Sequence, residues 1–338
     1  MSTKIKRIIG IMLALAMVTC IFAGCDKTPV DDEISTNGAS VSGKVYKVGI
    51  CQLVQHDALD AATNGFMAAL KDKLGNNVEF DLQNAAGDSP TCSTITNQFV
   101  VDKVDLIMAN ATPALQSAMA ATSEIPIVAT SITDFATALE SDNWTGKTGI
   151  NVTGTADLAP LAEQAKMLTE LVPSAKTVGI LYCSAEANSK YQSDVITKEL
   201  TKLGCNAVVY TVADTNEISS VVTKACSEVD ALYIPTDNTI ASATAAVEEI
   251  ASSAKIPVIA GEEGICKGCG IATLSISYYS IGYNAGLMAY DILVNGANAG
   301  DMEIQYSTEL TKKYVESRCT KLGIEIPSDY VAIEMSAE

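Results

Sequence analysis

The 338-residue chain has few of the basic side chains on which nucleic-acid binders depend, and almost no histidine. It has one histidine, and its 22 lysines and arginines are outnumbered by 40 acidic residues, which gives a net charge of −18. This charge argues against nucleic acid and anionic membrane surfaces as partners. A single histidine rules out a site with metal-spaced histidine pairs, and we expect neither a metal nor a cofactor.

Catalytic motifs are missing as well. The chain has no G-x-S-x-G turn, no glycine-rich phosphate loop, and no nucleophile that is obviously placed beside His56, its single histidine. We therefore predict no catalytic residues and no enzymatic activity.

What the chain does have is a leader. A positively charged start at 4–7 precedes an apolar run at 8–16, which is too short to span a bilayer comfortably. The sequence FAGC at 22–25 resembles a lipobox. We predict a signal peptide at 1–24, acylation of Cys25, and an extracytoplasmic protein that is lipid-anchored to the cell membrane. The alternative is an uncleaved anchor helix.

Residues 25–43 are rich in Asp, Ser, Thr and Gly, which predicts a flexible tether. From residue 44 on, short β-branched runs alternate with helical patterns, and this alternation predicts βαβ units and a parallel sheet. The first predicted strands are 45–54, 78–82, 106–109 and 127–130, and the helices between them are 59–74, 94–101 and 113–122.

The pattern then restarts about 130 residues further on. Three short segments recur in order: 48–50 as 178–180, 104–105 as 229–230, and 125–129 as 256–260. We infer an α/β fold of two similar, doubly wound parallel-sheet lobes. The first crossover is predicted at 151–158, where Gly154 and Asp157 would break the strand before a helix at 160–171.

Ten cysteines in an exported chain would usually indicate disulfides. Here they are scattered through apolar strand and helix patterns, as Cys51, Cys183, Cys205 and Cys226 show, so we expect mostly free thiols. Cys266 and Cys269 form the one suggestive pair, with a redox or metal role as the alternative to a structural one.

Ligands of open parallel sheets bind beyond the carboxyl ends of the strands. In the first lobe the residues there bear mainly hydroxyls and amides, and in the second lobe carboxylates, which fits a zwitterion held between the two. The candidates are Gln52, Leu53, His56, Thr112, Pro113, Thr130 and Ser131 in the first lobe, and Tyr182, Glu186, Asn188, Ser189, Asp237, Asn238 and Glu262 in the second.

Several of these positions also have a purely structural interpretation, which stays open. The structural alternatives are a helix N-cap for His56, Thr112, Asp237 and the nearby Asp134, and a solvated loop for 186–189.

Nine short motifs carry a family resemblance: QLV at 52–54 with His56, ALDA at 58–61, ATPA at 111–114, NVTG at 151–154, VGILY at 178–182, EANS at 186–189, PTDN at 235–238, GEEG at 261–264, and SYY with GY at 277–283. Together they resemble the ABC-transporter substrate-binding family associated with tryptophan and other aromatic amino acids. The resemblance covers nearly all of 44–330. The family usually lacks the cysteine pair at 266 and 269.

The resemblance implies a type I periplasmic-binding fold whose lobes are joined by a three-strand hinge. Lobe 1 would comprise 44–153 and 277–302, and lobe 2 would comprise 154–276 and 303–338. The implied partners are a small zwitterionic ligand, foremost an L-aromatic amino acid, and an ABC permease in the membrane. We expect a monomer.

Amino-acid binders of this fold also imply roles for the candidates. By similarity, the ligand carboxylate would meet Thr112 and Thr130 or Ser131, and its ammonium would meet Asp237, with Glu186 as a further candidate. The side-chain pocket would use Leu53, His56 and Tyr182, and Tyr279 completes the predicted ligand set. The alternatives are a receptor coupled to a sensor, or a binder of another small solute such as a branched-chain amino acid, a nucleoside or a sugar.

Overall fold

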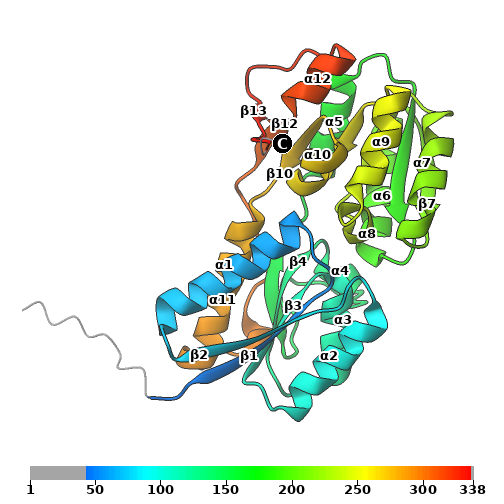
Figure 1. Ribbon diagram of the computed structural model, residues 1–338. Helices are drawn as coiled ribbons and strands as arrows, with labels where there is room; N and C mark the ends of the chain where they lie inside the picture. The colour runs from blue at the N-terminus through cyan, green and yellow to red at the C-terminus, as the bar shows by residue number, and fades with distance from the viewer. Residues whose placement is uncertain (1–42, 336–338) are drawn as a thin grey trace, which may run out of the picture. The chain divides into compact units, whose positions relative to one another are not determined.

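The computed structural model describes residues 43–335, so the predicted signal peptide, Cys25 and nearly all of the tether lie outside the described residues. Two sheets with helices packed on them make up the described part (Figure 1). The strand order is β2-β1-β3-β4-β5-β11 in the first sheet and β7-β6-β8-β9-β10-β12-β13 in the second. The order of the first five strands is equivalent in the two sheets, which confirms the predicted pair of similar α/β lobes.

Each lobe is defined here as one sheet with the helices that pack on it. The strands of the first sheet are β1 (Tyr46–Gln52), β2 (Val78–Asn84), β3 (Leu106–Asn110), β4 (Ile127–Ile132), β5 (Val152–Ala156) and β11 (Gln305–Tyr306). Those of the second are β6 (Thr177–Cys183), β7 (Asn206–Val212), β8 (Ala231–Ile234), β9 (Val258–Ala260), β10 (Ala272–Ser275), β12 (Thr311–Tyr314) and β13 (Val331–Ala332). All pairings are parallel except that of β10 with β12.

The helices follow the same division. The first lobe carries α1 (Asp57–Leu74), α2 (Ser89–Val101), α3 (Thr112–Ala121), α4 (Phe135–Ala138) and α11 (Tyr278–Asn295). The second carries α5 (Leu161–Leu171), α6 (Ala187–Lys202), α7 (Ile218–Cys226), α8 (Asn238–Ala241), α9 (Thr244–Ala254), α10 (Glu263–Cys269) and α12 (Glu316–Leu322). Two 3-10 turns complete the set, η1 (Thr215–Glu217) and η2 (Ala299–Asp301). None of the helices within 43–335 has the length and apolar character needed to cross a bilayer.

The internal repeat has a structural basis in two equivalent aspartates. Asp105 accepts a hydrogen bond from the backbone N–H of Lys47 at 2.8 Å, just as β1 begins. Asp230 accepts from the N–H groups of Lys176 and Thr177, both at 2.8 Å, where β6 begins. In each lobe an aspartate before the third strand therefore holds the start of the first strand.

The chain passes between the sheets three times, after β5, after β10 and after β11. β5 continues to Ala156, past the predicted boundary at 153, and β11 lies past the boundary at 302. The prediction that Gly154 breaks the strand is wrong, because β5 runs through it. Gly154 has a φ of +154°, and a Cβ there would overlap the backbone of Ala129, so glycine allows β4 and β5 to pair.

The first lobe depends on close contact between α1 and α11, which lie side by side in Figure 1. A Cβ at Gly65 would overlap the carbonyl oxygen of Tyr279, and a Cβ at Gly282 would overlap that of Ala62. The two helix backbones therefore touch where glycine removes the side chain. The close contact fixes α11 against α1 along the first sheet.

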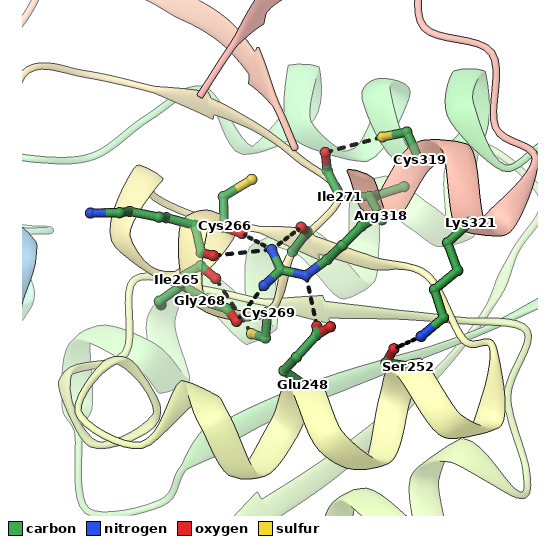
Figure 2. A network of polar contacts seen from close by, with 12 residues as sticks. Glu248, Ser252, Ile265, Cys266, Gly268, Cys269, Ile271, Arg318, Cys319 and Lys321 are labelled. Atoms are coloured by element: carbon green, nitrogen blue, oxygen red, sulfur yellow. Dashed lines mark hydrogen bonds and ion pairs between the residues drawn. The ribbon is translucent and has the colours of Figure 1, made fainter. Parts of the chain in front are cut away.

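The cysteines are free thiols throughout the described residues. Arg318 closes the end of α10 where Cys266 and Cys269 lie: its guanidinium donates to the carbonyl of Gly268 at 2.7 Å and pairs with Glu248 at 2.8 Å (Figure 2). Both thiols are buried, and burial raises the pKa of each. Within 43–335 no cluster of three or more potential ligands could hold a metal.

We expect Gly282→Ala to destabilise the protein. Alanine ordinarily favours a helix over glycine, but here the methyl group meets the backbone of α1, and overpacking of this kind costs about 1–3 kcal/mol. Urea unfolding of the two proteins measures the difference. Asn284→Ala, at an exposed position of the same helix, serves as the control and should leave stability nearly unchanged. A Gly282→Ala protein as stable as the control would contradict the close contact.

Candidate functional site

A cavity lies between the carboxyl ends of strands from both lobes, beside the first and second crossovers. We call it the hinge cavity, and its volume is about 10 Å³, which is about the space that one water molecule needs. Its residues from the first lobe are His56, Leu59, Ser131, Thr133, Asp157 and Tyr278, and those from the second are Asn188, Thr236, Asp237, Asn238, Ala241, Glu262 and Ile265. Its place agrees with the rule that ligands bind at the ends of parallel strands.

The cavity gathers buried polar atoms that have no protein partner. Eight such side-chain atoms occur among the described residues, and four of them line this one cavity: Nδ1 of His56, Oγ of Ser131, Oδ1 of Asp157 and Oδ1 of Asn188. A buried polar atom without a partner costs about 1–3 kcal/mol. Their concentration in one place indicates a site whose partners come from a ligand.

Two of these atoms are hydrogen-bond acceptors only: Oδ1 of Asp157 while its carboxylate is ionised, and the amide oxygen of Asn188. Asp157 Oδ2 accepts from the Tyr278 hydroxyl at 2.7 Å, which leaves Oδ1 toward the cavity. The amide nitrogen of Asn188 donates to Glu186 Oε2 and to the carbonyl of Thr236, each at 3.2 Å. This orientation leaves the Asn188 oxygen as the group without a partner.

The electrostatic environment is acidic. No lysine or arginine lines the hinge cavity, whereas three buried carboxyl groups do. Burial is the main cause that raises the pKa of Asp157 and of Asp237, and it raises the pKa of Glu262 to about 7. Burial also lowers the pKa of His56, which favours its neutral form. The cavity therefore suits a positively charged group.

The predicted ligand residues divide between two cavities. His56, Ser131, Asn188, Asp237, Asn238 and Glu262 line the hinge cavity. A second cavity, the outer cavity, lies nearer the ends of β1, β2, β6 and β7, and it is lined by Leu53, Pro113 and Glu186 together with Asn238 and other residues. Asn238 is the residue that the two cavities share. Gln52, Thr112, Thr130, Tyr182, Ser189 and Tyr279 line neither.

Two of the six residues outside the two cavities have structural hydrogen-bond partners instead. Gln52 joins β1 to α1, because its amide nitrogen donates to Asp60 at 2.6 Å and its oxygen accepts from Thr63 at 2.7 Å. Thr130 is buried and accepts from the hydroxyl of Thr155 at 2.9 Å.

The remaining four differ in burial. Tyr182 packs in the core of the second lobe, and Ser189 is buried in the first turn of α6. Thr112 is buried at the start of α3. Tyr279 is 48% exposed and stacks on Tyr283.

The structural alternatives are resolved one by one. Asp237 caps α8 by accepting from the N–H of Ile240, and Asp134 caps α4 in the same way through Thr137, so both cap interpretations are confirmed. The second oxygen of Asp237 accepts from the N–H of Cys183 at 2.7 Å. Both oxygens of Asp237 are thus already bonded within the protein.

The cap alternative for Thr112 and the loop alternative for residues 186–189 are wrong. Thr112 is the first residue of α3 rather than its cap, and Ala111 occupies the cap position with a φ of +88°. His56 stands at the cap position of α1, but its side chain makes no capping bond. Residues 186–189 are not a solvated loop, because Glu186 is 4% exposed and α6 begins directly after it.

Sequence reasoning missed Asp157, Thr133, Thr236 and Tyr278. Asp157 directly follows β5, so the strand-end rule would have found it had the strand been placed through Gly154. Tyr278 stands beside the predicted Tyr279 but is only 7% exposed, because it begins α11 at the hinge.

Three comparisons agree with this geometry. Residues 47–335 match the family described as ABC transporter substrate binding protein. A tyrosine-binding protein of Clostridioides difficile (strain R20291) is 35% identical over 309 residues, which is 89% of this chain and 88% of that protein. The ABC domain from Streptococcus pneumonia in complex with L-Trp is 32% identical, with a TM-score of 0.81 over 84% of this chain and 97% of that one.

A further solved structure is the ligand-free, open form of a substrate binding protein with adhesive properties from Clostridium difficile. It is 38% identical to this chain and has a TM-score of 0.65, covering 86% of this chain and all of that one.

The chain is a two-lobed binding protein of the type I periplasmic-binding fold. It belongs to the ABC transporter substrate-binding protein family, whose members bind a small molecule outside the cytoplasm and partner an ABC permease. The predicted family and the expectation that the chain is not an enzyme are thereby confirmed.

The raised pKa of Glu262 has a consequence for stability. Its ordinary value is 4.5, and burial raises it to about 7, so between these values the folded protein binds more protons than the unfolded chain. The free energy of unfolding should therefore rise, by an amount on the order of 1–3 kcal/mol, as the pH falls from 8 to 5.

Glu262→Gln should weaken this pH dependence, since glutamine carries no charge while it keeps one of the two oxygens that accept from the N–H groups of Gly264 and Ile265. Urea unfolding at several pH values measures it, with Glu249→Gln at an exposed position as the control. An unchanged slope in Glu262→Gln would show that this carboxyl group is not the source.

Proposed function

We propose that this protein captures an L-aromatic amino acid between its lobes and presents it to an ABC permease for import. The observation that carries the proposal is the set of unpaired acceptor atoms in an acidic cavity without lysine or arginine. An α-ammonium group supplies three N–H donors and a positive charge, which is what such a cavity lacks.

The ammonium is assigned to Asp157 rather than to the predicted Asp237. Asp157 has one oxygen held by Tyr278 and one oxygen without a partner, whereas both oxygens of Asp237 are used within the protein. Asn188 adds a second acceptor from the opposite lobe. A ligand ammonium bonded to both would join the two lobes.

The ligand carboxylate is assigned to Ser131, whose hydroxyl is buried, has no partner and can donate. Ser131 has a φ of +57°, a strained conformation that turns the chain just inside the end of β4. Thr112 and Thr130 remain candidates close to this end of the sheet, although neither lines the hinge cavity. Because no lysine or arginine lines the hinge cavity, hydroxyl and backbone N–H groups would donate the hydrogen bonds to the ligand carboxylate.

The aromatic ring is assigned to the outer cavity. The first lobe contributes Leu53, Val54 and Pro113 to its wall, and the second contributes Ala185 and Ala213, so the wall has apolar surface on both sides. The tyrosine-binding relative and the neighbour with bound L-Trp support an aromatic side chain.

Contacts between the lobes support capture by closure. His56 contacts Asn238 at 3.2 Å, Thr133 contacts Thr236 at 3.4 Å, and Lys267 pairs with Asp57 at 3.1 Å. The chain also has a higher TM-score with the L-Trp complex than with the open, ligand-free protein, despite lower sequence identity to the former. A hinge between lobes explains both observations.

L-Trp or L-Tyr should stabilise the protein, by about 2.7 kcal/mol at a hundred times the dissociation constant. Asp157→Asn keeps an oxygen for Tyr278 but turns an N–H donor toward the ammonium. Affinity for the amino acid should therefore fall by about tenfold to a hundredfold. Calorimetry measures both effects, and Asp142→Asn at an exposed position is the control.

The same experiment distinguishes other ligand classes. A panel of aromatic and branched-chain amino acids, nucleosides and sugars covers them. Tight binding of a sugar or nucleoside, with no effect of Asp157→Asn, would overturn the proposal and leave the fold and family standing.

The proposed anchor is the acylated Cys25, which lies outside the described residues. Cys25→Ala should release the protein from membranes or leave its signal uncleaved, since acylation needs that thiol. Membrane fractionation with labelled fatty acid tests this. A Cys25→Ala protein that still carries the label would show that the anchor lies elsewhere.

A further inference from the structure

We infer that Glu186, acting through Asn238, places the proton of His56 on Nε2, so that closure of the lobes presents the lone pair of Nδ1 to the ligand ammonium. This inference rests on the proposed function and concerns the same hinge cavity. Glu186 and Asn238 are positioning residues here, and His56 is the ligand contact.

The first step is the orientation of the Asn238 amide. The Glu186 carboxylate accepts from the backbone N–H of Asn238 at 3.1 Å and from its side-chain nitrogen at 2.7 Å. Its other oxygen accepts from the N–H and the hydroxyl of Thr239, both at 2.8 Å. A carboxylate only accepts, so the Asn238 nitrogen must face Glu186, and the Asn238 oxygen must face away from it.

The second step is the proton of His56. The Asn238 oxygen lies 3.2 Å from Nε2 of His56. Two acceptors do not form a hydrogen bond, so Nε2 carries the hydrogen. A neutral imidazole has one N–H, which leaves Nδ1 as an acceptor. Nδ1 is one of the four buried atoms of the hinge cavity that have no protein partner.

The third step is what this acceptor requires. An ammonium can donate to Nδ1 of the neutral ring. The opposite tautomer and the imidazolium both present an N–H there, which would repel it. The charged and titratable groups around His56 are Asp57 and Asp60 on α1, Lys267 on α10, and Asp157, Glu186, Asp237 and Glu262.

The contact of His56 with Asn238, which Glu186 orients, exists only when the two lobes are closed. His56 belongs to the first lobe, while Asn238 and Glu186 belong to the second. When the lobes separate, Nε2 loses Asn238 and the ring is free to adopt either tautomer. Closure therefore creates a buried acceptor, which costs free energy unless a ligand donates to it. The His56–Asn238 contact thus makes closure favour ligands that carry an ammonium.

The chain itself supplies the measurement, because His56 is its single histidine. Ring 15N NMR of an untagged protein therefore reports one residue without assignment. In the complex with L-Trp or L-Tyr we expect the hydrogen on Nε2 and an unprotonated Nδ1. A complex with the hydrogen on Nδ1, or with an imidazolium, would overturn the inference while the proposed function stands. No binding of either amino acid would overturn both.

Asn238→Asp provides a second test, which does not depend on assigning tautomers. An aspartate beside Nε2 stabilises the doubly protonated ring, and its Nδ1–H then faces the ammonium. Affinity for L-Trp should fall at least tenfold at pH 7 and recover as the pH rises. Asn206→Asp is the matched control, since it makes the same change of charge at an exposed position that lines neither cavity. A loss that is equal at all pH values, or is shared by Asn206→Asp, would contradict the proposed effect on His56.

Discussion

The contact between the backbones of α1 and α11 is the constraint on which the site depends. Glycines at 65 and 282 let the two helix backbones come into direct contact, and a Cβ at either position would overlap the backbone of the other helix. His56 precedes the first residue of α1, and Tyr278 is the first residue of α11. The glycine contact therefore sets the positions of both side chains at the hinge cavity. Through Tyr278 it also orients Asp157, which the phenol holds by a hydrogen bond.

The second lobe prepares its side of the cavity by a different means. There the polar groups are connected to one another: Glu186 holds the first turn of α8, Asp237 caps it, and Asn188 is bonded to Glu186. A network in which nearly every donor and acceptor is used leaves little freedom for the few that are not. The unpaired oxygen of Asn188 is thus held in place before a ligand arrives, which lowers the entropy cost of binding.

The fold could be predicted from the sequence because its signals are local and repeated. Strand-like runs alternate with helical ones, and the aspartates at 105 and 230 recur at equivalent places. The strand-end rule likewise placed His56, Ser131 and Asn188 at the cavity they line.

The failures came from information that a linear pattern does not hold. Gly154 was predicted to end its strand, as glycines in turns do. Glycine is needed there for another reason, because the backbone of Ala129 on the neighbouring strand leaves no room for a Cβ. Tyr278 and Tyr279 are adjacent, but on a helix one residue turns the side chain by about 100°, which separates a hinge residue from a largely exposed one. The second partner of Asp237, the N–H of Cys183, lies on another strand, so only its cap on α8 could be expected from the local sequence.

The three crossings of the chain have a further consequence for how the protein must fold. α11, which packs on α1, follows the whole of α5 to α10 in sequence, so the first lobe is not a continuous piece of chain. During synthesis or export from the N-terminus, α1 emerges long before its main helical partner. The glycine-lined face of α1 and the adjoining apolar face of the first sheet therefore stay exposed until most of the second lobe has emerged. Contacts so distant in sequence slow folding. This lobe is therefore the one that we expect to need protection from aggregation before the chain is complete.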